Sequence, residues 1–307
     1  MRAVVMREFG PPEVLAGAEV PDPVPGPGQV LIEVEAAGIT FVETQVRAGR
    51  APNPAMLPAL PAILGNGVAG WLDGSRVVST TGGGGGGYAE AVAVGGDLPI
   101  AVPDGVSSLD ALALLADGRT ALGVLRRIEP RPGERVLVHA AGGGVGNLLV
   151  QLVTAAGAHA VGAASAAAKL ELARRAGAVQ TVDYGADGWA GGIEPVDVVI
   201  DGVGGAVGRA AIGALRDGGR LYVLGMASGE YAVPQPERGI RVAGLWDAPF
   251  TPQELRELST LALAEAAAGR LRPTIGQTYP LERAAEAHAA IEARTTVGKT
   301  VLLTRRG

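Results

Sequence analysis

The sequence predicts an α/β protein in which a doubly wound parallel sheet is joined to a β-rich domain built from both ends of the chain. Short apolar strands alternate with helical patterns over residues 135–224, which favours parallel strands linked by right-handed crossovers. Residues 1–35 and 299–304 are instead typical of strands. A chain of 307 residues is long enough for two domains, each with its own core.

The N-terminal part is predicted to be strands separated by glycine and proline. Residues 3–6 and 30–35 are strand candidates, and residues 71–78 predict a β-hairpin with Asp73-Gly74 as its turn. Six consecutive glycines, Gly82–Gly87, follow. Two interpretations of that run stay open, a flexible linker and a loop that lets a ligand approach the backbone.

A helical pattern over residues 108–127 ends at a Pro-Arg-Pro-Gly segment and leads into the alternating region. There, strands are predicted at 136–138, 158–161, 179–182, 196–200 and 219–224, and helices at 147–156, 166–176 and 207–215. The rest is predicted as an edge strand at 240–246, a helix at 252–268 with Thr251 as N-cap, a helix at 281–293 and a last strand at 299–304.

A glycine-rich turn follows the first strand of the alternating region. Its spacing is Ala141-x-Gly143-x-x-Gly146, with Gly144 and Val145 between the last two fixed positions. Strand, glycine turn and helix place backbone N–H groups and a helix N-terminus against a phosphate. Gly143 would let the backbone approach a pyrophosphate, and Gly146 would let the helix pack closely on its strand.

His139 lies at the end of the strand beneath this turn. It has two interpretations, a residue in proton chemistry and a buried, hydrogen-bonded support.

The choice of dinucleotide follows from the segment after the second strand. NAD-binding versions of this fold carry an acid there for the ribose 2′-OH, and residues 161–169 contain none. Ser165 and Lys169 can donate hydrogen bonds to a 2′-phosphate instead. We therefore expect NADPH. Alternatively, Lys169 is a solvated lysine of a first helical turn.

Composition excludes several function classes. The formal net charge is −5 and no basic run precedes the pair Arg305-Arg306, which argues against nucleic-acid or anionic-membrane partners. The absence of cysteine excludes disulfides and thiolate zinc sites, and the three histidines are far apart in sequence, so no metal site is expected. With neither a signal peptide nor a long apolar run, we expect a cytoplasmic protein.

These motifs resemble the medium-chain dehydrogenase/reductase superfamily, and in particular its zinc-free quinone oxidoreductase branch. The resemblance spans nearly the whole chain in the family's order. It is carried by AGITFVET (37–44), LGNGVAG (64–70), GRTA (118–121), HAAGGGVG (139–146), DGVGG (201–205), GMASG (225–229) and RTTVGK (294–299). Zinc-containing relatives have Cys in place of Thr40 and Gly-His-Glu in place of Gly65-Asn66-Gly67.

The resemblance implies a GroES-like domain over 1–113 and 265–307 and a Rossmann domain over 114–264, with NADPH in the cleft between them. It implies cofactor contacts from Thr44, Thr120 and Arg294. Further contacts are implied for Lys169 and Tyr184 near the adenosine 2′-phosphate, Val203 near the nicotinamide ribose, and Gly225, Met226, Ala227 and Ser228 near the nicotinamide. Thr40 and Asn66 are the candidate catalytic hydrogen-bond donors to the substrate oxygen. Alternatively, each is a structural residue that satisfies the backbone of a turn.

The implied activity is hydride transfer from NADPH to a quinone or an α,β-unsaturated carbonyl compound. Bacterial quinone reductases often carry tyrosines just after the Thr44 segment, whereas Gln45 and Ala51 stand in that region here, and the loop after Gly70 is short. The alternatives are an enoyl reductase of polyketide or lipid metabolism and a non-catalytic, crystallin-like NADPH-binding protein. The apolar segment Ile240–Trp246 is expected to pair with its mate in a homodimer.

Overall fold

The computed structural model describes residues 1–83, 85–233, 238–245 and 249–304. The chain divides into two compact units. The β-rich unit comprises Met1–Ala116 and Ser259–Gly307, and the α/β unit comprises Asp117–Leu258.

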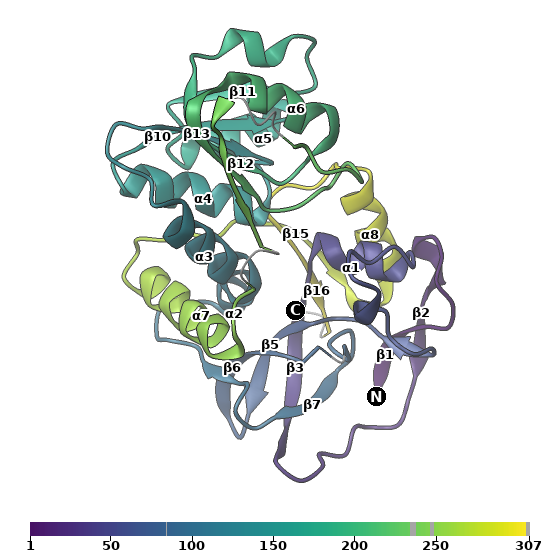
Figure 1. Cartoon of the computed structure of the whole chain (residues 1–307). Coiled ribbons are helices and arrows are strands. Elements are labelled where there is room, and N and C mark those ends of the chain that lie inside the picture. The colour runs from purple at the N-terminus through teal and green to yellow at the C-terminus, as the bar shows by residue number, and fades with distance from the viewer. Residues whose placement is uncertain (84, 234–237, 246–248, 305–307) are drawn as a thin grey trace. The chain divides into compact units, whose positions relative to one another are not determined.

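The β-rich unit contains two sheets (Figure 1). The smaller sheet has the order β2-β1-β4, with β1 Arg2–Met6, β2 Leu15–Glu19 and β4 Ala62–Ile63. The larger has the order β15-β16-β3-β5-β6-β8, and β7 pairs with β3 off this path. Its strands are β3 Gln29–Ile39, β5 Gly67–Leu72, β6 Ser75–Thr80, β7 Ala91–Gly95, β8 Ile100–Ala101, β15 Ile275–Pro280 and β16 Lys299–Leu303.

The two ends of the chain meet in the larger sheet. Strand β16 runs antiparallel to β3, with Thr300 opposite Ile39 and Leu303 opposite Ala36. Arg2 also donates a hydrogen bond of 2.9 Å to the carbonyl of Thr304. A β-rich domain formed from both chain ends is therefore confirmed.

The predicted hairpin is also confirmed. Strands β5 and β6 pair antiparallel with Leu72 opposite Ser75. The turn residues Asp73 and Gly74 have φ values of 48° and 77°, the left-handed values that a two-residue hairpin turn requires.

The α/β unit is built on a six-stranded sheet of order β11-β10-β9-β12-β13-β14. Every strand pair in it is parallel. The strands are β9 Arg135–His139, β10 His159–Ala164, β11 Gln180–Asp183, β12 Val196–Asp201, β13 Leu215–Val223 and β14 Arg241–Gly244. This is the doubly wound order, which reverses between β9 and β12.

Helices α4, α5 and α6 pack against this sheet (Figure 1). Their bounds are α4 Gly144–Ala155, α5 Ala167–Arg175 and α6 Gly205–Ala214. The strand cores are apolar, and Val136, Leu137 and Val138 are fully buried. This burial on both faces explains why the strands are continuous apolar runs without alternation.

The helix predicted over residues 108–127 is interrupted. The structure has α2 Ser108–Ala113, a π-helical turn over Leu114–Gly118 and α3 Arg119–Ile128. Gly118 is a poor helix former, and Asp117 in the same turn is buried against Gly144 of the α/β unit. The wider turn directs that polar side chain to its contact, which leucine spacing does not reveal.

The remaining helices are α1 Phe41–Arg47, α7 Pro252–Ala267 and α8 Ala284–Glu292. Thr251 caps α7 as expected: its Oγ1 accepts a hydrogen bond of 3.2 Å from the Glu254 N–H. Helix α8 packs against α1 within the β-rich unit (Figure 1). Helix α1 and strand β15 were not expected from the sequence.

Candidate functional site

Most of the predicted cofactor residues lie at the carboxyl ends of the parallel strands. The glycine turn follows β9, Ser165 follows β10, and Tyr184 follows β11. Val203 follows β12, and residues 225–228 follow β13. Ligands of doubly wound folds bind at these ends, next to the point where the strand order reverses.

The glycine turn is held against β9 by close backbone packing. A Cβ on Gly146 would come within 2.2 Å of the Ala140 carbonyl oxygen, so only glycine fits there. The Ala141 N–H donates to the Ala163 carbonyl at 3.0 Å, and the Gly143 N–H donates to the Ala140 carbonyl at 2.8 Å. These contacts fix the path of the chain into α4.

Helix α4 begins at Gly144 with Gly143 as N-cap, and no side chain of the N-cap accepts a hydrogen bond. Gly143, Gly144 and Val145 are partly exposed. A helix N-terminus whose residues are partly exposed suits a phosphate, because both its N–H groups and the helix dipole favour an anion. The residues present therefore fit the pyrophosphate of a dinucleotide.

Asp117 is a residue of this region that sequence reasoning missed. Its side chain is buried and packs against Gly144. A Cβ on Gly144 would come within 2.0 Å of Asp117 Oδ2. A carboxylate beside the first turn of a helix is stabilised by the helix dipole. Because Asp117 lay inside a predicted helix, nothing in the local sequence pattern indicated this contact.

The candidate 2′-phosphate residues lie at the ends of β10 and β11. Ser165 is exposed, and Lys169 is in the first turn of α5. Lys169 packs against Gly142, where a Cβ would come within 2.4 Å of Lys169 Cβ. The Tyr184 ring meets the His139 ring edge-on at 5.9 Å. Their roles toward a nucleotide stay predictions.

His139 is a buried, hydrogen-bonded side chain. Its Nδ1 lies 2.8 Å from Asp201 Oδ1, and both side chains are fully buried. The Tyr184 and Trp189 rings each pack against it at 5.9 Å between centroids. This geometry favours the interpretation of His139 as a support over that of a proton donor.

In the β-rich unit, both candidate catalytic residues are held by one carboxyl group, that of Glu43. Glu43 Oε2 accepts hydrogen bonds from the Thr40 N–H at 2.6 Å and from Thr40 Oγ1 at 3.0 Å. Glu43 Oε1 accepts from the Asn66 N–H at 2.9 Å. The structure thus brings Thr40, at the start of α1, together with Asn66, just before β5.

Glu43, Thr40 and Asn66 differ in their exposure to solvent. Glu43 is 7% exposed, Thr40 is partly exposed and Asn66 is exposed. Burial raises the pKa of the Glu43 carboxyl above its ordinary value, and the hydrogen bonds from Thr40 and Asn66 offset only part of that effect. The Thr-x-x-Glu spacing is a capping-box signature, and it could have identified Glu43 from the sequence.

Three other predicted cofactor residues lie in a helix or directly after one. Thr44 is fully buried, and its Oγ1 donates to the Phe41 carbonyl at 2.7 Å. Thr120 is in the first turn of α3, partly exposed. Arg294 follows α8 in a left-handed conformation, with φ of 58°, and is exposed. Their cofactor contacts stay predictions.

The end of the glycine run is a packed loop, so the linker interpretation is wrong for residues 85–87. The Gly86 N–H donates to the Ile63 carbonyl at 2.7 Å, and the Gly87 N–H donates to the Gly65 carbonyl at 3.0 Å. A Cβ on Gly85 would come within 2.4 Å of the Ile63 carbonyl oxygen. The loop therefore supports the segment that carries Asn66. Gly84 lies outside the described residues.

Within residues 1–83, 85–233, 238–245 and 249–304, no group of three or more His, Cys, Asp or Glu side chains is placed to hold a metal ion. In the same part of the chain, none of the helices has the length and apolar character needed to cross a membrane.

Comparison with known proteins identifies relatives over the full length of the chain. A family model described as zinc-binding dehydrogenase matches residues 176–302. The chain is 31% identical to a quinone oxidoreductase of Pseudomonas aeruginosa, over 96% of this chain and 97% of that protein. It is 30% identical to a 2-haloacrylate reductase of a Burkholderia species, over 98% of each chain.

The same similarity extends to solved structures. The quinone oxidoreductase from Thermus thermophilus, whose structure is known alone and in complex with NADPH, matches with a TM-score of 0.86 and 32% identity. That match covers 99% of this chain and 100% of the other.

Proposed function

Because this chain belongs to the quinone oxidoreductase branch of the medium-chain dehydrogenase/reductase superfamily, we propose that it transfers a hydride from NADPH to an electron-poor carbon. The acceptor is a quinone or an α,β-unsaturated carbonyl compound. The proposal rests mainly on the carboxyl ends of the parallel strands, where the glycine turn, Ser165 and Val203 each follow one of three neighbouring strands.

NADPH supplies the hydride, and the chain's own residues bind and orient it. Gly144 and Val145 hold the pyrophosphate through backbone N–H groups at the start of α4, and Gly143, whose own N–H donates to Ala140, lets the pyrophosphate approach the backbone closely. Ser165 and Lys169 take the 2′-phosphate, because no acid in residues 161–169 would repel it.

The β-rich unit supplies the residues for the acceptor in this proposal. Thr40 and Asn66 donate hydrogen bonds to the acceptor oxygen, on which negative charge develops as the hydride arrives at carbon. For this, the Thr40 hydroxyl turns its single hydrogen from Glu43 Oε2 to the acceptor oxygen. Glu43 holds the backbone of both residues in place. The backbone at both residues is then fixed before the acceptor binds, and this lowers the cost of ordering the two donors during the reaction.

The 2-haloacrylate reductase relative favours activated alkenes as a second acceptor class beside quinones. A panel of 1,4-naphthoquinone, a medium-chain 2-enone and an enoyl thioester separates the candidates by NADPH oxidation at 340 nm. We expect turnover with the quinone or the enone. Turnover confined to the thioester would assign an enoyl reductase, and a flat trace with all three, together with NADPH binding, would assign a non-catalytic NADPH-binding protein.

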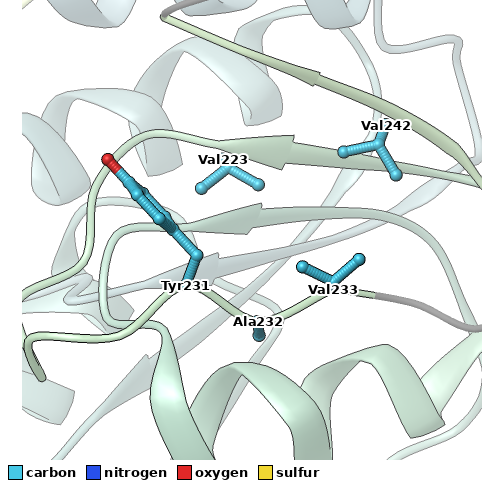
Figure 2. Close-up of a pocket in the computed structure, with 5 residues that line it drawn as sticks. All are labelled: Val223, Tyr231, Ala232, Val233 and Val242. Carbon is cyan, nitrogen blue, oxygen red and sulfur yellow. The ribbon is translucent and has the colours of Figure 1, made fainter.

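We also propose a homodimer formed through strand β14. Among the described residues β14 ends the sheet and pairs only with β13, so one side of its backbone is available for a second copy. Beside it lies an apolar pocket of about 320 Å³ lined by Val223, Tyr231, Ala232, Val233 and Val242 (Figure 2). Trp246, the end of the predicted segment, lies outside the described residues.

Val242 is 47% exposed, and a charge there would oppose dimer formation. Val179, 59% exposed and just before β11 at the opposite edge of the sheet, is the matched control. Light scattering after size exclusion should show a dimer for the wild type and Val179→Lys, and a monomer for Val242→Lys. A monomeric wild type would refute the homodimer.

A further inference from the structure

Asp201, the last residue of β12, accepts an unusual number of hydrogen bonds through one side-chain atom. Its Oδ1 accepts from the backbone N–H of Val203 at 2.8 Å and of Gly204 at 2.9 Å. The same oxygen lies 2.8 Å from His139 Nδ1. Because His139 ends β9, this carboxyl group joins the two strands between which the sheet order reverses.

The backbone of Asp201 extends these connections to the loop after β13. Its carbonyl oxygen accepts from the N–H groups of Leu224 at 2.8 Å and Gly225 at 3.2 Å. The Ser228 N–H then donates to the Val203 carbonyl at 2.8 Å, so the two loops run side by side. Asp201 is therefore linked to the strand before the glycine turn, to the Val203 loop and to residues 225–228.

The space around Asp201 permits little rearrangement. A Cβ on Gly208 would come within 2.4 Å of Asp201 Oδ2. Gly204 has φ of 72°, and a Cβ there would come within 1.9 Å of the Glu230 carbonyl oxygen. The loop after β12 is therefore confined on both sides.

The electrostatics agree with an ionised carboxylate at this point. Burial acts to raise the pKa of Asp201, but the hydrogen bonds from His139 and from the N–H groups of Gly204 and Val203 outweigh it and hold the pKa below its ordinary value. Asp201 Oδ2 and His139 Nε2 are buried and make no hydrogen bond. The hydrogen bonds of the Asp201 side chain with His139, Val203 and Gly204 thus all involve Oδ1.

We propose that Asp201 is a positioning residue for the nicotinamide half of NADPH, acting through the Val203 loop and residues 225–228. This inference rests on the proposed NADPH binding and adds to it a residue that acts on the nicotinamide half through the two loops. Removing the charge would loosen both loops, so that part of the binding energy is used to order them.

The test compares two probes of different length on matched variants. NADPH occupies the whole site, whereas adenosine 2′,5′-bisphosphate lacks the nicotinamide half and uses the region of Ser165, Lys169 and Tyr184 together with the glycine turn, which takes its 5′-phosphate. Asp201→Asn keeps an oxygen at the Oδ1 position and removes the charge. Asp197→Asn is the control, because Asp197 is the second residue of the same strand and also accepts from a backbone N–H, that of Arg135, at 2.8 Å.

Dissociation constants are measured by calorimetry for the full chain. We expect Asp201→Asn to raise the Kd for NADPH by about tenfold, equivalent to about 1.4 kcal/mol. Its Kd for adenosine 2′,5′-bisphosphate should change by less than about twofold, and Asp197→Asn should change neither. Asp201→Ala should show the same selective loss, larger in size, and if it does not fold, the Asn variant decides.

Two results would overturn the inference. Equal weakening of both probes would reduce Asp201 to a general structural role, and unchanged NADPH affinity would remove its role altogether. A wild-type chain that binds no NADPH would refute the proposed function as well. Normal wild-type binding with an unaffected Asp201→Asn would refute this inference alone.

Discussion

One prediction concerns two capping boxes of the same spacing that should respond to pH in opposite directions. Thr40 and Glu43 form one at the start of α1, and Thr251 and Glu254 form the other at the start of α7. Glu43 is buried and Glu254 is exposed. Replacing each glutamate by glutamine therefore changes the same motif in two environments.

The cost of Glu43→Gln follows from the number of acceptor oxygens. Both carboxyl oxygens of Glu43 accept from backbone N–H groups, Oε1 from Asn66 and Oε2 from Thr40. Glutamine has one oxygen, so its amide NH2 must face a backbone N–H, which then has no acceptor. A partly buried donor without a partner costs about 1 kcal/mol, the low end of the range for buried groups, or about 2–4 °C in Tm for a unit of this size.

The pH dependence separates the two glutamates. Because the pKa of Glu43 is raised in the folded state, ionisation lowers stability as pH rises from about 4.5 through the folded pKa. The penalty of Glu43→Gln should therefore shrink as pH rises. Hydrogen bonds from Thr251 lower the pKa of Glu254, so its contribution is present above the ordinary carboxyl pKa and is lost as pH falls. The penalty of Glu254→Gln should grow with pH.

The measurement is the apparent Tm of the wild type and both variants by calorimetry from pH 4.5 to 7.5. Steady-state kinetics supply a second readout: Glu43→Gln should raise KM for the acceptor through Thr40 and Asn66, and Glu254→Gln should not. If the penalties of both variants grow with pH in parallel, our account of Glu43 is wrong.

Three further predictions test other parts of the structure. Burial and the charge of Arg47 lower the pKa of His288 to about 3. The contribution of His288 to stability should therefore fall by roughly 1.4 kcal/mol per pH unit below about 6.5. His288→Gln should flatten this dependence of stability on acid pH in thermal scans, and an unchanged slope would contradict the prediction. Lys169→Ala should narrow a preference for NADPH over NADH in fluorescence titrations, whereas equal wild-type affinities would refute the NADPH assignment. Turnover should be unaffected by EDTA; loss of activity that zinc restores would show that a metal takes part.

The fold was largely predictable because its signals are local. Apolar runs such as 136–138 and 196–200 lie on strands of the parallel sheet, and Asp73-Gly74 forms the expected turn. Errors occurred where a distant contact overrides local preference. The helix at 108–127 is interrupted because Asp117 packs on Gly144, which lies further along the chain. Strand β15 has few local signals, and its partner β16 lies at the end of the chain.

The candidate site also contains residues that local spacing predicts and contacts that depend on segments distant in sequence. Gly143, Gly146, Ser165 and Lys169 could be chosen from spacing alone, because each follows directly from a strand and the turn after it. Glu43 could have been found from its capping-box spacing, but its hydrogen bond to the Asn66 N–H requires two segments that are distant in sequence. That second bond distinguishes Glu43 from Glu254.

The sequence by itself determined the alternation of strands and helices, the glycine turn and the absence of an acid that would repel a 2′-phosphate. Each of these depends on residues within one turn or one strand of each other. The tertiary structure alone decided that Asp201 and His139 meet, and that one buried carboxyl holds Thr40 and Asn66. Such pairings arise only when folding brings distant strand ends together and excludes water, so that a single carboxylate oxygen becomes the acceptor for several donors.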